Sequence, residues 1–322
     1  MCSTKRALIG IMAAALLGVG GLASAQDTTR LSIGTGGTGG VYYPLGGGMA
    51  SILSKNVPGW QATAEVTGAS VANLQLIGQG KQDFGLVMAD AAWDAVSGLG
   101  KFKSNKVDAR TLMVLYPNKV HVVTVEGNGV NKIADFKGKR ISTGEPNSGT
   151  ELLALRLLEA AGIAKDVNRE RLSVAEGVNA IKDRKIDGLI WVGGLPTAAI
   201  TDLATTPGIT VKLLDHAEYA EEMNKKWGPL YVKGTIPKGT YKAQEKENAN
   251  LDVWNLLVAD KKMSDQMAYT IVKTLMEKKA DLVAVHREAQ NITLEAQADS
   301  SPIPIHPGAR KYFEEQGVKF KN

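Results

Sequence analysis

One glycine-rich segment constrains this chain more than any other feature. Five of the seven residues from 34 to 40 are glycine, after a β-branched run at 31–35 and before a helical pattern that reaches about Lys55. Glycines let the backbone turn tightly and bring N–H groups against a ligand. A helix that starts at once adds unpaired amide donors and the positive end of its dipole. The segment therefore predicts an anion-binding loop without a charged side chain. The alternative, a flexible connector, leaves its hydroxyls and Tyr42 and Tyr43 unexplained.

The same glycines match the G-x-G-x-x-G spacing of dinucleotide-binding folds, which is weak support when it stands alone. No acidic residue ends a second strand about twenty residues later, because residues 60–66 run into Thr67 and Gly68. The chain also has no Gly-Lys-Ser/Thr sequence for a nucleotide phosphate. We therefore expect no nucleotide and no other cofactor.

The rhythm of strands and helices predicts an α/β fold. Strands are predicted at 31–35, 61–66, 84–88, 111–116, 120–126, 140–143 and 188–192, and helices at 71–79, 91–96, 149–161, 177–184, 197–204, 265–279, 282–289 and 307–316. A faint repeat relates residues 33–36 to 141–144 and residues 83–87 to 187–190. The repeat predicts two similar α/β lobes that face each other across one ligand cleft at the carboxyl ends of strands.

The lobe boundaries follow from two places where the chain is expected to cross. A break at residues 117–119 separates two β-rich runs, and a return crossing is expected near residues 229–236. We expect lobe I to comprise residues 26–116 and 231–322, and lobe II to comprise residues 117–230.

The first 25 residues have the pattern of an export signal. Lys5 and Arg6 precede an apolar stretch at 7–22, and small residues at 23–25 predict cleavage after Ala25. Cys2 is the only cysteine and lies inside this signal, so we expect a periplasmic protein without disulfides. The formal net charge is only +5, and the basic residues are scattered along the chain. Neither feature indicates a nucleic-acid-binding protein.

Three further loops place hydroxyls beside predicted helix starts. Residues 67–73 carry Ser70, which either caps the following helix or adds a second anion cradle. Residues 143–151 carry three hydroxyls, more than capping alone requires, and residues 191–196 place Trp191 and two glycines at a strand end. Catalytic patterns are missing: the four histidines have no metal-ligand spacing, and the sequence has no Gly-x-Ser-x-Gly elbow. We therefore do not expect an enzyme.

These four loops, in this order, resemble the signatures of the TAXI solute receptors, the extracytoplasmic component of one class of TRAP transporters. The resemblance covers nearly the whole chain after the signal and includes the ending at 303–312. It implies a type II periplasmic-binding-protein-like fold, with two α/β lobes, a hinge and a central ligand cleft. By motif match it places ligand contacts at Gly37, Thr38, Gly39, Tyr42, Ser70, Thr143, Ser148, Gly149, Thr150 and Trp191. Asp90 and Tyr116 are added because they follow predicted strands.

The resemblance also implies a function. A monomeric receptor would close on a small anionic metabolite and deliver it to a membrane TRAP permease of the fused type. The family's ligands make a C5 dicarboxylate or its amide the best expectation: glutamate, 2-oxoglutarate or glutamine. The four loops contain no arginine, so hydroxyls and helix-start amides would have to hold the carboxylate. A periplasmic sensor that feeds a membrane kinase, and an exported α/β enzyme, remain as alternatives.

Overall fold

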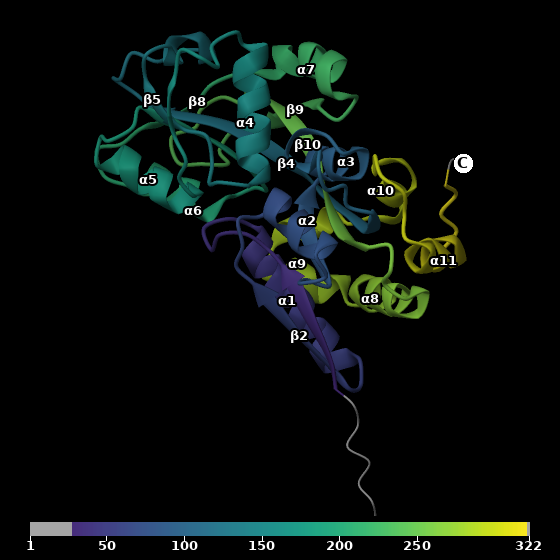
Figure 1. Ribbon diagram of the computed structural model, residues 1–322. Coiled ribbons are helices and arrows are strands. Elements are labelled where there is room, and N and C mark those ends of the chain that lie inside the picture. The colour runs from purple at the N-terminus through teal and green to yellow at the C-terminus, as the bar shows by residue number, and fades with distance from the viewer. Residues whose placement is uncertain (1–27, 321–322) are drawn as a thin grey trace, which may run out of the picture.

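The computed structural model describes residues 28–320 of the chain. The predicted export signal and its cleavage after Ala25 lie outside these described residues. Within them the fold is mixed α/β, with two α/β lobes, so the predicted α/β fold class is confirmed (Figure 1). None of the helices in residues 28–320 has the length and apolar character needed to cross a membrane.

The strands form one continuous sheet in the order β2-β1-β3-β10-β4-β7-β5-β6, with β8 beside β4 and β9 beside β10. The strands are β1 (Thr29–Gly34), β2 (Trp60–Glu65), β3 (Phe84–Met88), β4 (Ala109–Val125), β5 (Arg140–Ser142), β6 (Asn168–Glu170), β7 (Gly188–Gly193), β8 (Val211–Leu213), β9 (Val232–Ile236) and β10 (Asn248–Asp260). The α-helices are α1 (Tyr42–Asn56), α2 (Ser70–Gly78), α3 (Ala89–Ser97), α4 (Gly149–Ala160), α5 (Val174–Lys182), α6 (Ala198–Thr205), α7 (Ala220–Trp227), α8 (Asp265–Glu277), α9 (Lys279–Val285), α10 (Leu294–Asp299) and α11 (Pro307–Glu315).

The two halves of the sheet repeat one pattern. In the first half β1 pairs in parallel with β2 and β3, and in the second half β5 pairs in parallel with β6 and β7. A helix follows each of these six strands: α1, α2 and α3 in the first half, and α4, α5 and α6 in the second. The third strand of each set then meets an antiparallel neighbour, β10 or β4. The internal repeat predicted from the sequence is therefore confirmed as a structural repeat.

Two aspartates, Asp83 and Asp187, account for the sequence match between residues 83–87 and 187–190. An oxygen of Asp83 accepts the Ser32 backbone N–H at 2.7 Å in the first half. An oxygen of Asp187 accepts the Arg140 backbone N–H at 2.8 Å in the second half. Each aspartate stands just before the third strand of its half and satisfies a backbone donor of the first strand, and satisfied backbone donors are a general requirement of folded chains.

Two long strands join the halves. The predicted break at residues 117–119 is wrong, because β4 runs without interruption from Ala109 to Val125. Pro117 is accommodated beside a register shift between Trp254 and Leu256 of β10, so the strand bulges instead of ending. The return crossing expected near residues 229–236 is made by β10, since β9 pairs only with the Asn248–Asp252 end of that strand. Figure 1 shows β4 and β10 running side by side between the lobes.

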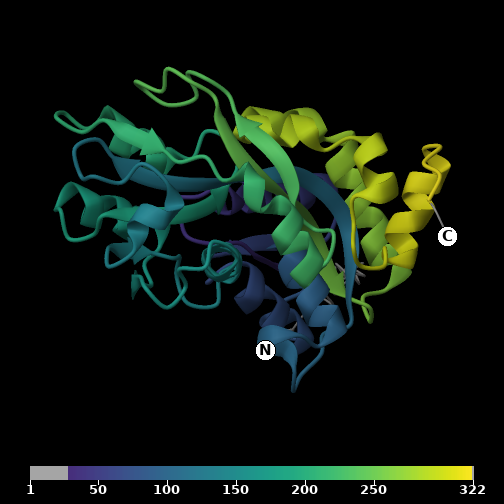
Figure 2. The ribbon, with the colours of Figure 1, turned by 90° about the horizontal axis from the view of Figure 1, so that it is seen from above.

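The C-terminal helices close the first half, as the sequence predicted. Both α8 and α9 pack against α1, and α11 packs against α8 and β4. Figure 2 shows these yellow helices together along one side of the sheet. Their buried residues, such as Ile271, Leu275 and Phe313, join Leu45 and Met49 of α1 in one hydrophobic cluster.

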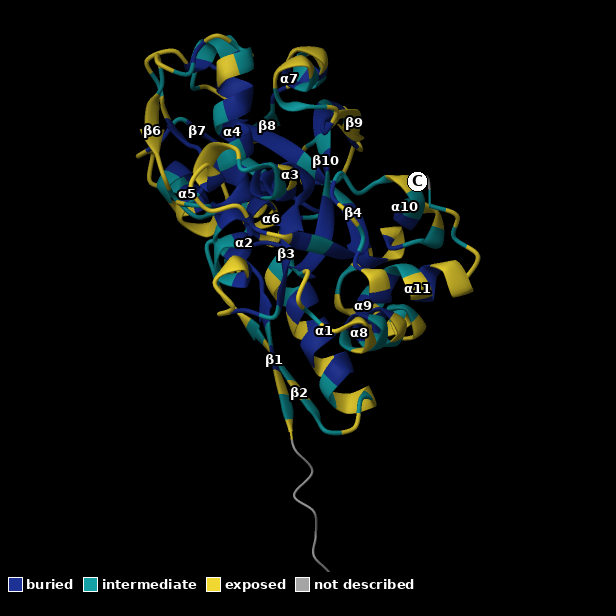
Figure 3. Ribbon diagram, turned by 45° about the vertical axis from the view of Figure 1, so that its right-hand side comes forward, coloured by how far each residue is buried: buried dark blue, intermediate teal, exposed yellow. Residues whose placement is uncertain are grey.

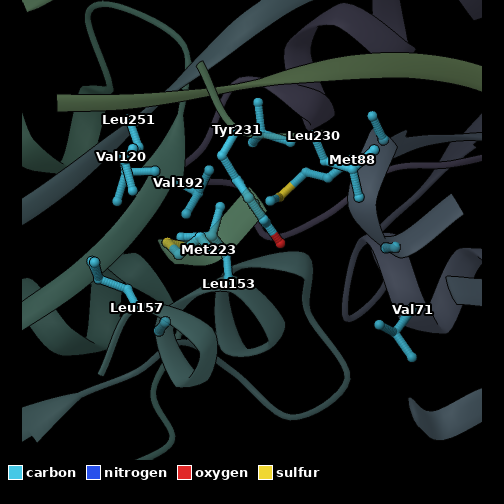
Figure 4. Packing of buried hydrophobic residues seen from close by; sticks show 14 of the residues in the cluster. Val71, Met88, Val120, Leu153, Leu157, Val192, Met223, Leu230, Tyr231 and Leu251 are labelled. Carbon is cyan, nitrogen blue, oxygen red and sulfur yellow. The ribbon is translucent and has the colours of Figure 1, made fainter. Parts of the chain in front are cut away.

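A second cluster of buried side chains extends across both halves. It includes Val71 of α2, Met88 of β3, Leu153 and Leu157 of α4, and Tyr231, which precedes β9. Figure 4 shows Tyr231 among apolar side chains that come from different elements of this cluster. In Figure 3 the central strands are largely dark blue, while exposed residues lie on the outward sides of the helices, in loops and on the edge strands β2 and β6. The lobes therefore share packed apolar surface next to their cleft.

Candidate functional site

The described residues enclose a small cavity between the two halves of the sheet. It lies where β4 crosses from one half to the other, and residues from both halves line it. The space open to the centre of a water molecule is about 30 Å³, whereas about 10–15 Å³ suffices for one water. In this conformation the cavity therefore holds only a few heavy atoms, so a larger ligand would require the two halves to move apart.

Five helices begin at this cavity. Its lining includes the first residues of α1, α2, α4 and α5, which are Tyr42, Ser70, Gly149 and Val174, and also Met88, the N-cap residue of α3. This arrangement follows from the fold, because the carboxyl ends of β1–β3 and of β5 and β6 face each other near the middle of β4, and a helix follows each of these strands. A helix start presents unpaired N–H donors and about half a positive charge. The five starts together make an environment that favours an anion.

The glycine-rich segment reaches the cavity through Gly36, Gly37 and Gly40. A Cβ atom on Gly40 would lie 3.0 Å from the Trp191 ring, so a larger residue would push the aromatic ring away. Trp191 is fixed from the other side, where its Nε1 donates to Thr197 Oγ1 at 2.9 Å. The glycine loop of the first half therefore packs directly against the end of β7 in the second half.

Two hydroxyls of the second half have their oxygen occupied by a backbone donor. Ser148 Oγ accepts from Glu151 N at 2.9 Å and caps α4. Thr150 Oγ1 accepts from Val192 N at 3.3 Å. Within residues 28–320 neither hydroxyl donates to another protein group, and both residues line the cavity. Their O–H groups are therefore available to donate to a ligand acceptor.

Ser70 belongs to the first half of the sheet and lies close to the start of α4 in the second half. It is the first residue of α2 and makes no capping hydrogen bond, so the capping alternative for Ser70 is wrong. Its Oγ instead accepts from Met88 N at 3.1 Å, which fixes the side chain against the end of β3. A Cβ atom on Gly149 would lie 2.6 Å from this oxygen and 2.5 Å from the Met88 sulfur. The start of α4 therefore approaches the start of α2 as closely as a glycine allows.

The bulge of β4 points two side chains at the cavity. Tyr116 and Asn118 stand two residues apart, on the same side of the strand, and both line the cavity. Asn255 of β10 organises them: its Nδ2 donates to Tyr116 O at 3.1 Å, and its Oδ1 accepts from Asn118 Nδ2 at 2.8 Å. The Tyr42 hydroxyl also donates to Asn255 Oδ1. In the described part of the chain, Tyr116 Oη and Asn118 Oδ1 are buried without a hydrogen-bond partner.

Charge is scarce at the site. Among the described residues, the cavity lining includes no lysine, arginine or histidine, and its one charged side chain is Glu145. Burial, reinforced by the negative charge of Glu176, raises the pKa of Glu145 above its usual value. Any anion held here would have to be bound by neutral donors and helix starts.

The comparison with known families decides where the chain belongs. The model of the NMT1-like family matches residues 33–317, which is most of the chain. The chain belongs to the NMT1-like family.

Individual relatives of this NMT1-like chain are more distant. A protein of Brucella abortus (strain 2308), provisionally named a binding protein, is 31% identical over 120 residues, which are 37% of this chain and 34% of that protein. A Brucella suis biovar 1 protein with the same kind of name matches to the same extent. The chain thus matches about a third of the length of these curated relatives.

Two solved structures are similar to this chain to different extents. A structure from Bordetella bronchiseptica RB50 superposes with a TM-score of 0.53 at 16% identity, over 89% of each chain. The periplasmic aliphatic sulphonate binding protein of Escherichia coli has a TM-score of 0.45 at 14% identity, over 89% of this chain and 83% of that one. At these identities the likeness to the Bordetella structure concerns the fold alone.

The cavity of this NMT1-like protein brings together most of the residues singled out from the sequence. Eight of the twelve line it: Gly37, Tyr42, Ser70, Tyr116, Ser148, Gly149, Thr150 and Trp191. The structure places the other four elsewhere. Thr38 is not part of the lining, and a Cβ on Gly39 would meet the side chains of Val174 and Ala199. Thr143 is fully buried, and its Oγ1 accepts from Arg169 Nε at 3.3 Å.

Asp90 lies in a buried ion cluster that does not line the cavity. Arg156 of α4 donates to both oxygens of Asp94 at 2.7 and 2.8 Å, and its Nη1 lies 3.7 Å from Asp90 Oδ2. The Tyr231 hydroxyl accepts from Arg156 at 2.9 Å and donates to Asp90 Oδ2 at 3.1 Å. Asp90 follows a strand, as the sequence predicted, but its side chain pairs with a cation from the other half of the sheet.

Sequence reasoning missed several lining residues, including Met88, Asn118, Glu145, Ser173 and Val174. Glu145 stands inside the third loop, but a carboxylate in an anion-binding pattern carries no local signal of a binding role. Ser173 caps α5 by accepting from Glu176 N, and the Ser-x-x-Glu pattern at 173–176 is a capping box that marks a helix start. That pattern was a usable signal for the fifth helix at the cavity.

We expect Asp90 to make the stability of this NMT1-like protein pH-dependent. Burial raises the pKa of Asp90 to about 6, although the Arg156 charge acts to lower it. A carboxyl whose pKa is higher in the folded than in the unfolded state, where it is near 3.9, favours folding when it is protonated. The Asp90 contribution to the free energy of unfolding should therefore rise by roughly 1 kcal/mol between pH 7.5 and pH 5.

Urea unfolding of the wild type and of Asp90→Asn at both pH values isolates this contribution, because the other carboxyl groups are common to both proteins. The wild type should gain stability relative to the variant as the pH falls. Parallel pH profiles would show that Asp90 keeps an ordinary pKa in the folded protein.

Proposed function

We propose that this protein is an extracytoplasmic solute-binding protein that holds a small carboxylate between its two lobes and delivers it to a membrane transporter. The convergence of five helix starts on one small interlobe cavity carries this proposal. The two-lobed fold supports it, as does the name of the Brucella relatives as binding proteins. We propose no catalytic role for the cavity.

Neutral groups would supply the recognition of the carboxylate. Hydrogen bonds to a charged group contribute about 1.5–3 kcal/mol each, and they are stronger where water is excluded. The hydroxyls of Ser148 and Thr150 and the first N–H groups of α4 stand ready for one carboxylate. Four or five such bonds, less the entropy of ordering ligand and protein, support roughly micromolar affinity. The ligand would be a C5 dicarboxylate or its amide: glutamate, 2-oxoglutarate or glutamine.

Capture would follow a hinge mechanism in which the lobes rotate about the β4–β10 pair. We propose that the first lobe comprises residues 26–116 and the C-terminal helices, and that the second begins at residue 117. Because β9 pairs with the end of β10 that faces Lys119, the second lobe would extend past residue 230 to the middle of β10. Closure would then join the hydroxyls of α4 to the glycine loop and Ser70 around the ligand.

The transporter would be a TRAP permease of the fused type, and the protein would act in the periplasm as a monomer after cleavage of its signal at Ala25. The TAXI-like order of the four loops supports this partner. A receptor that reports the same ligand to a membrane kinase is the second candidate, since it would use the same cavity. Loss of ligand uptake on deletion of the gene, restored by the wild-type protein, would favour transport over sensing.

Removal of either hydroxyl should weaken binding. We expect Ser148→Ala and Thr150→Val each to raise the Kd for the ligand by about tenfold, because each removes one donor to a charged acceptor. Ser148→Ala should also lose about 1 kcal/mol of stability, since Ser148 caps α4. Isothermal titration gives the Kd values. Thr205→Val on the exposed surface of α6 is the matched control and should bind as the wild type does. Wild-type affinity in both cavity variants would contradict this site.

A thermal-melt screen tests the proposed function and identifies the ligand. The purified protein is stripped of ligand by unfolding and refolding, and then melted with glutamate, glutamine, 2-oxoglutarate, C4 dicarboxylates, citrate, sulfonates or neutral sugars. A ligand at a hundred times its Kd should add about 2.7 kcal/mol and shift the melt by several degrees. A shift with a carboxylate supports the proposal. A response to sugars alone, or to none of these compounds, would overturn it.

A further inference from the structure

Glu145 is a carboxylate in a site otherwise built for an anion. It lies in the loop between β5 and α4, is half-buried, and is the one charged side chain of the cavity lining in the described residues. Its Oε1 approaches the glycine loop across the cleft, 3.7 Å from the position that a Cβ on Gly37 would occupy. Within residues 28–320 the Glu145 carboxylate forms neither a hydrogen bond nor an ion pair with the protein.

Among the described residues, the half-buried Glu145 carboxylate lacks a partner that would replace the water it loses. Moving a carboxylate out of water is unfavourable unless a cation or hydrogen-bond donors take the place of the water. Burial and the nearby charge of Glu176 act in the same direction, and both raise the pKa of Glu145. The neighbouring carboxylate Glu151 shows the usual solution, because Arg169 and Arg171 pair with it at 3.0 and 2.6 Å. Glu145 has no such partner, so a ligand is left to provide one.

A second acceptor in the cavity, Asn118 Oδ1, also lacks a hydrogen-bond donor in the part of the chain that the structure describes. Asn118 is 1% exposed, and its Oδ1 is buried without a donor. Its Nδ2 donates to Asn255 Oδ1. Buried acceptors without partners are uncommon in folded proteins and call for an explanation. Glu145 and Asn118 both line this cavity, so a ligand bound in it meets two acceptors that lack donors. An ammonium group supplies three N–H donors and a positive charge.

We propose that Glu145 is a specificity-determining residue that receives the ammonium group of an α-amino acid ligand, with Asn118 as a further acceptor. The helix starts and hydroxyls would hold the carboxylate of the same ligand. The site would thereby select an amino acid over the 2-oxo acid of the same carbon skeleton. This inference rests on the proposed function, because it assigns the second pole of a ligand whose first pole is the carboxylate.

Matched ligand pairs test the inference. The stripped protein is titrated calorimetrically with L-glutamate and 2-oxoglutarate, with L-alanine and pyruvate, and with L-leucine and 4-methyl-2-oxopentanoate. Glu145→Gln removes the charge and keeps the size of the side chain. Glu170→Gln is the matched control, since Glu170 is exposed on β6 and does not line the cavity.

At least one amino acid should bind ten times more tightly than its 2-oxo partner. Glu145→Gln should weaken that amino acid at least tenfold and leave the 2-oxo acid unchanged or bound more tightly, while Glu170→Gln changes neither. Tighter binding of the 2-oxo acids, or an equal loss of both ligand types in Glu145→Gln, would overturn the inference and leave the proposed function standing. If no carboxylate of either type binds, the proposed function fails as well.

Discussion

Replacement of Arg156 by alanine should destabilise this protein by about 3–5 kcal/mol. The substitution leaves Asp90 and Asp94, which are 0% and 2% exposed, without their only paired cation in the structure described for residues 28–320. Breaking a buried ion pair by removing one partner strands a charge in a low-dielectric interior, and this produces losses of that size. The midpoint of thermal unfolding should fall by roughly 10 °C. Because Arg156 belongs to α4 and both aspartates to α3, the effect also measures how firmly the two halves are joined.

Two comparisons separate the buried charges from other losses. Arg140→Ala removes a cation from an exposed pair with Asp187, so it should change the free energy of unfolding by less than about 1 kcal/mol. The triple variant Asp90→Asn, Asp94→Asn, Arg156→Met removes all three charges together and should be far more stable than Arg156→Ala. If Arg156→Ala is no more harmful than Arg140→Ala, the cluster does not hold the lobes together.

Addition of one methyl group at Gly149 should cause the largest loss of ligand affinity. A Cβ at this position would lie 2.5 Å from the Met88 sulfur and 2.6 Å from Ser70 Oγ, and both atoms belong to the opposite half of the sheet. Gly149→Ala should therefore wedge the cleft open at the point where α4 meets α2. Overpacking of this kind disfavours the packed state by about 1–3 kcal/mol, which corresponds to a Kd increase of roughly 5- to 150-fold.

The matched control is Gly47→Ala, a glycine-to-alanine change inside α1 where an added Cβ would meet nothing within 4 Å. Calorimetric titration of the two variants with the same ligand gives the comparison, and circular dichroism checks that the fold is retained. Gly47→Ala should bind as the wild type does. Equal affinities of the two variants would mean that binding does not need the close approach of α4 to α2.

Much of the fold could be predicted because the first and second halves are built from local βα units. The strand at 84–88 was predicted with its observed bounds, since its five residues are all buried and Asp83 precedes it. By contrast, β10 was missed. Its sequence contains Asn248 and Asn255, which weaken a strand pattern. Both are buried here, and they form hydrogen bonds with Asp215 beside β8 and with Tyr116 and Asn118 of β4. Such partners are tertiary and leave no local signal.

The candidate site also contains residues that could be predicted from the local sequence and residues that could not. Gly37, Ser70 and Ser148 could be predicted because glycine loops and hydroxyls at helix starts have local sequence patterns. Asp90 has an equally suggestive local position, yet its partner Arg156 stands 66 residues away on a different lobe, and no short pattern links the two. Glu145 was passed over because its meaning depends on the absence of a cation around it, which only the assembled cavity reveals.

The central claim is that a small carboxylate binds between the lobes against the start of α4. Calorimetric titration of the stripped protein with the ligand found in the melt screen, in parallel with the Ser148→Ala, Thr150→Val double variant, tests it most directly. We expect one site per chain, a micromolar or lower Kd for the wild type, and at least a tenfold higher Kd for the double variant. Binding of the same strength in both proteins, or no saturable binding of any small carboxylate, would contradict it.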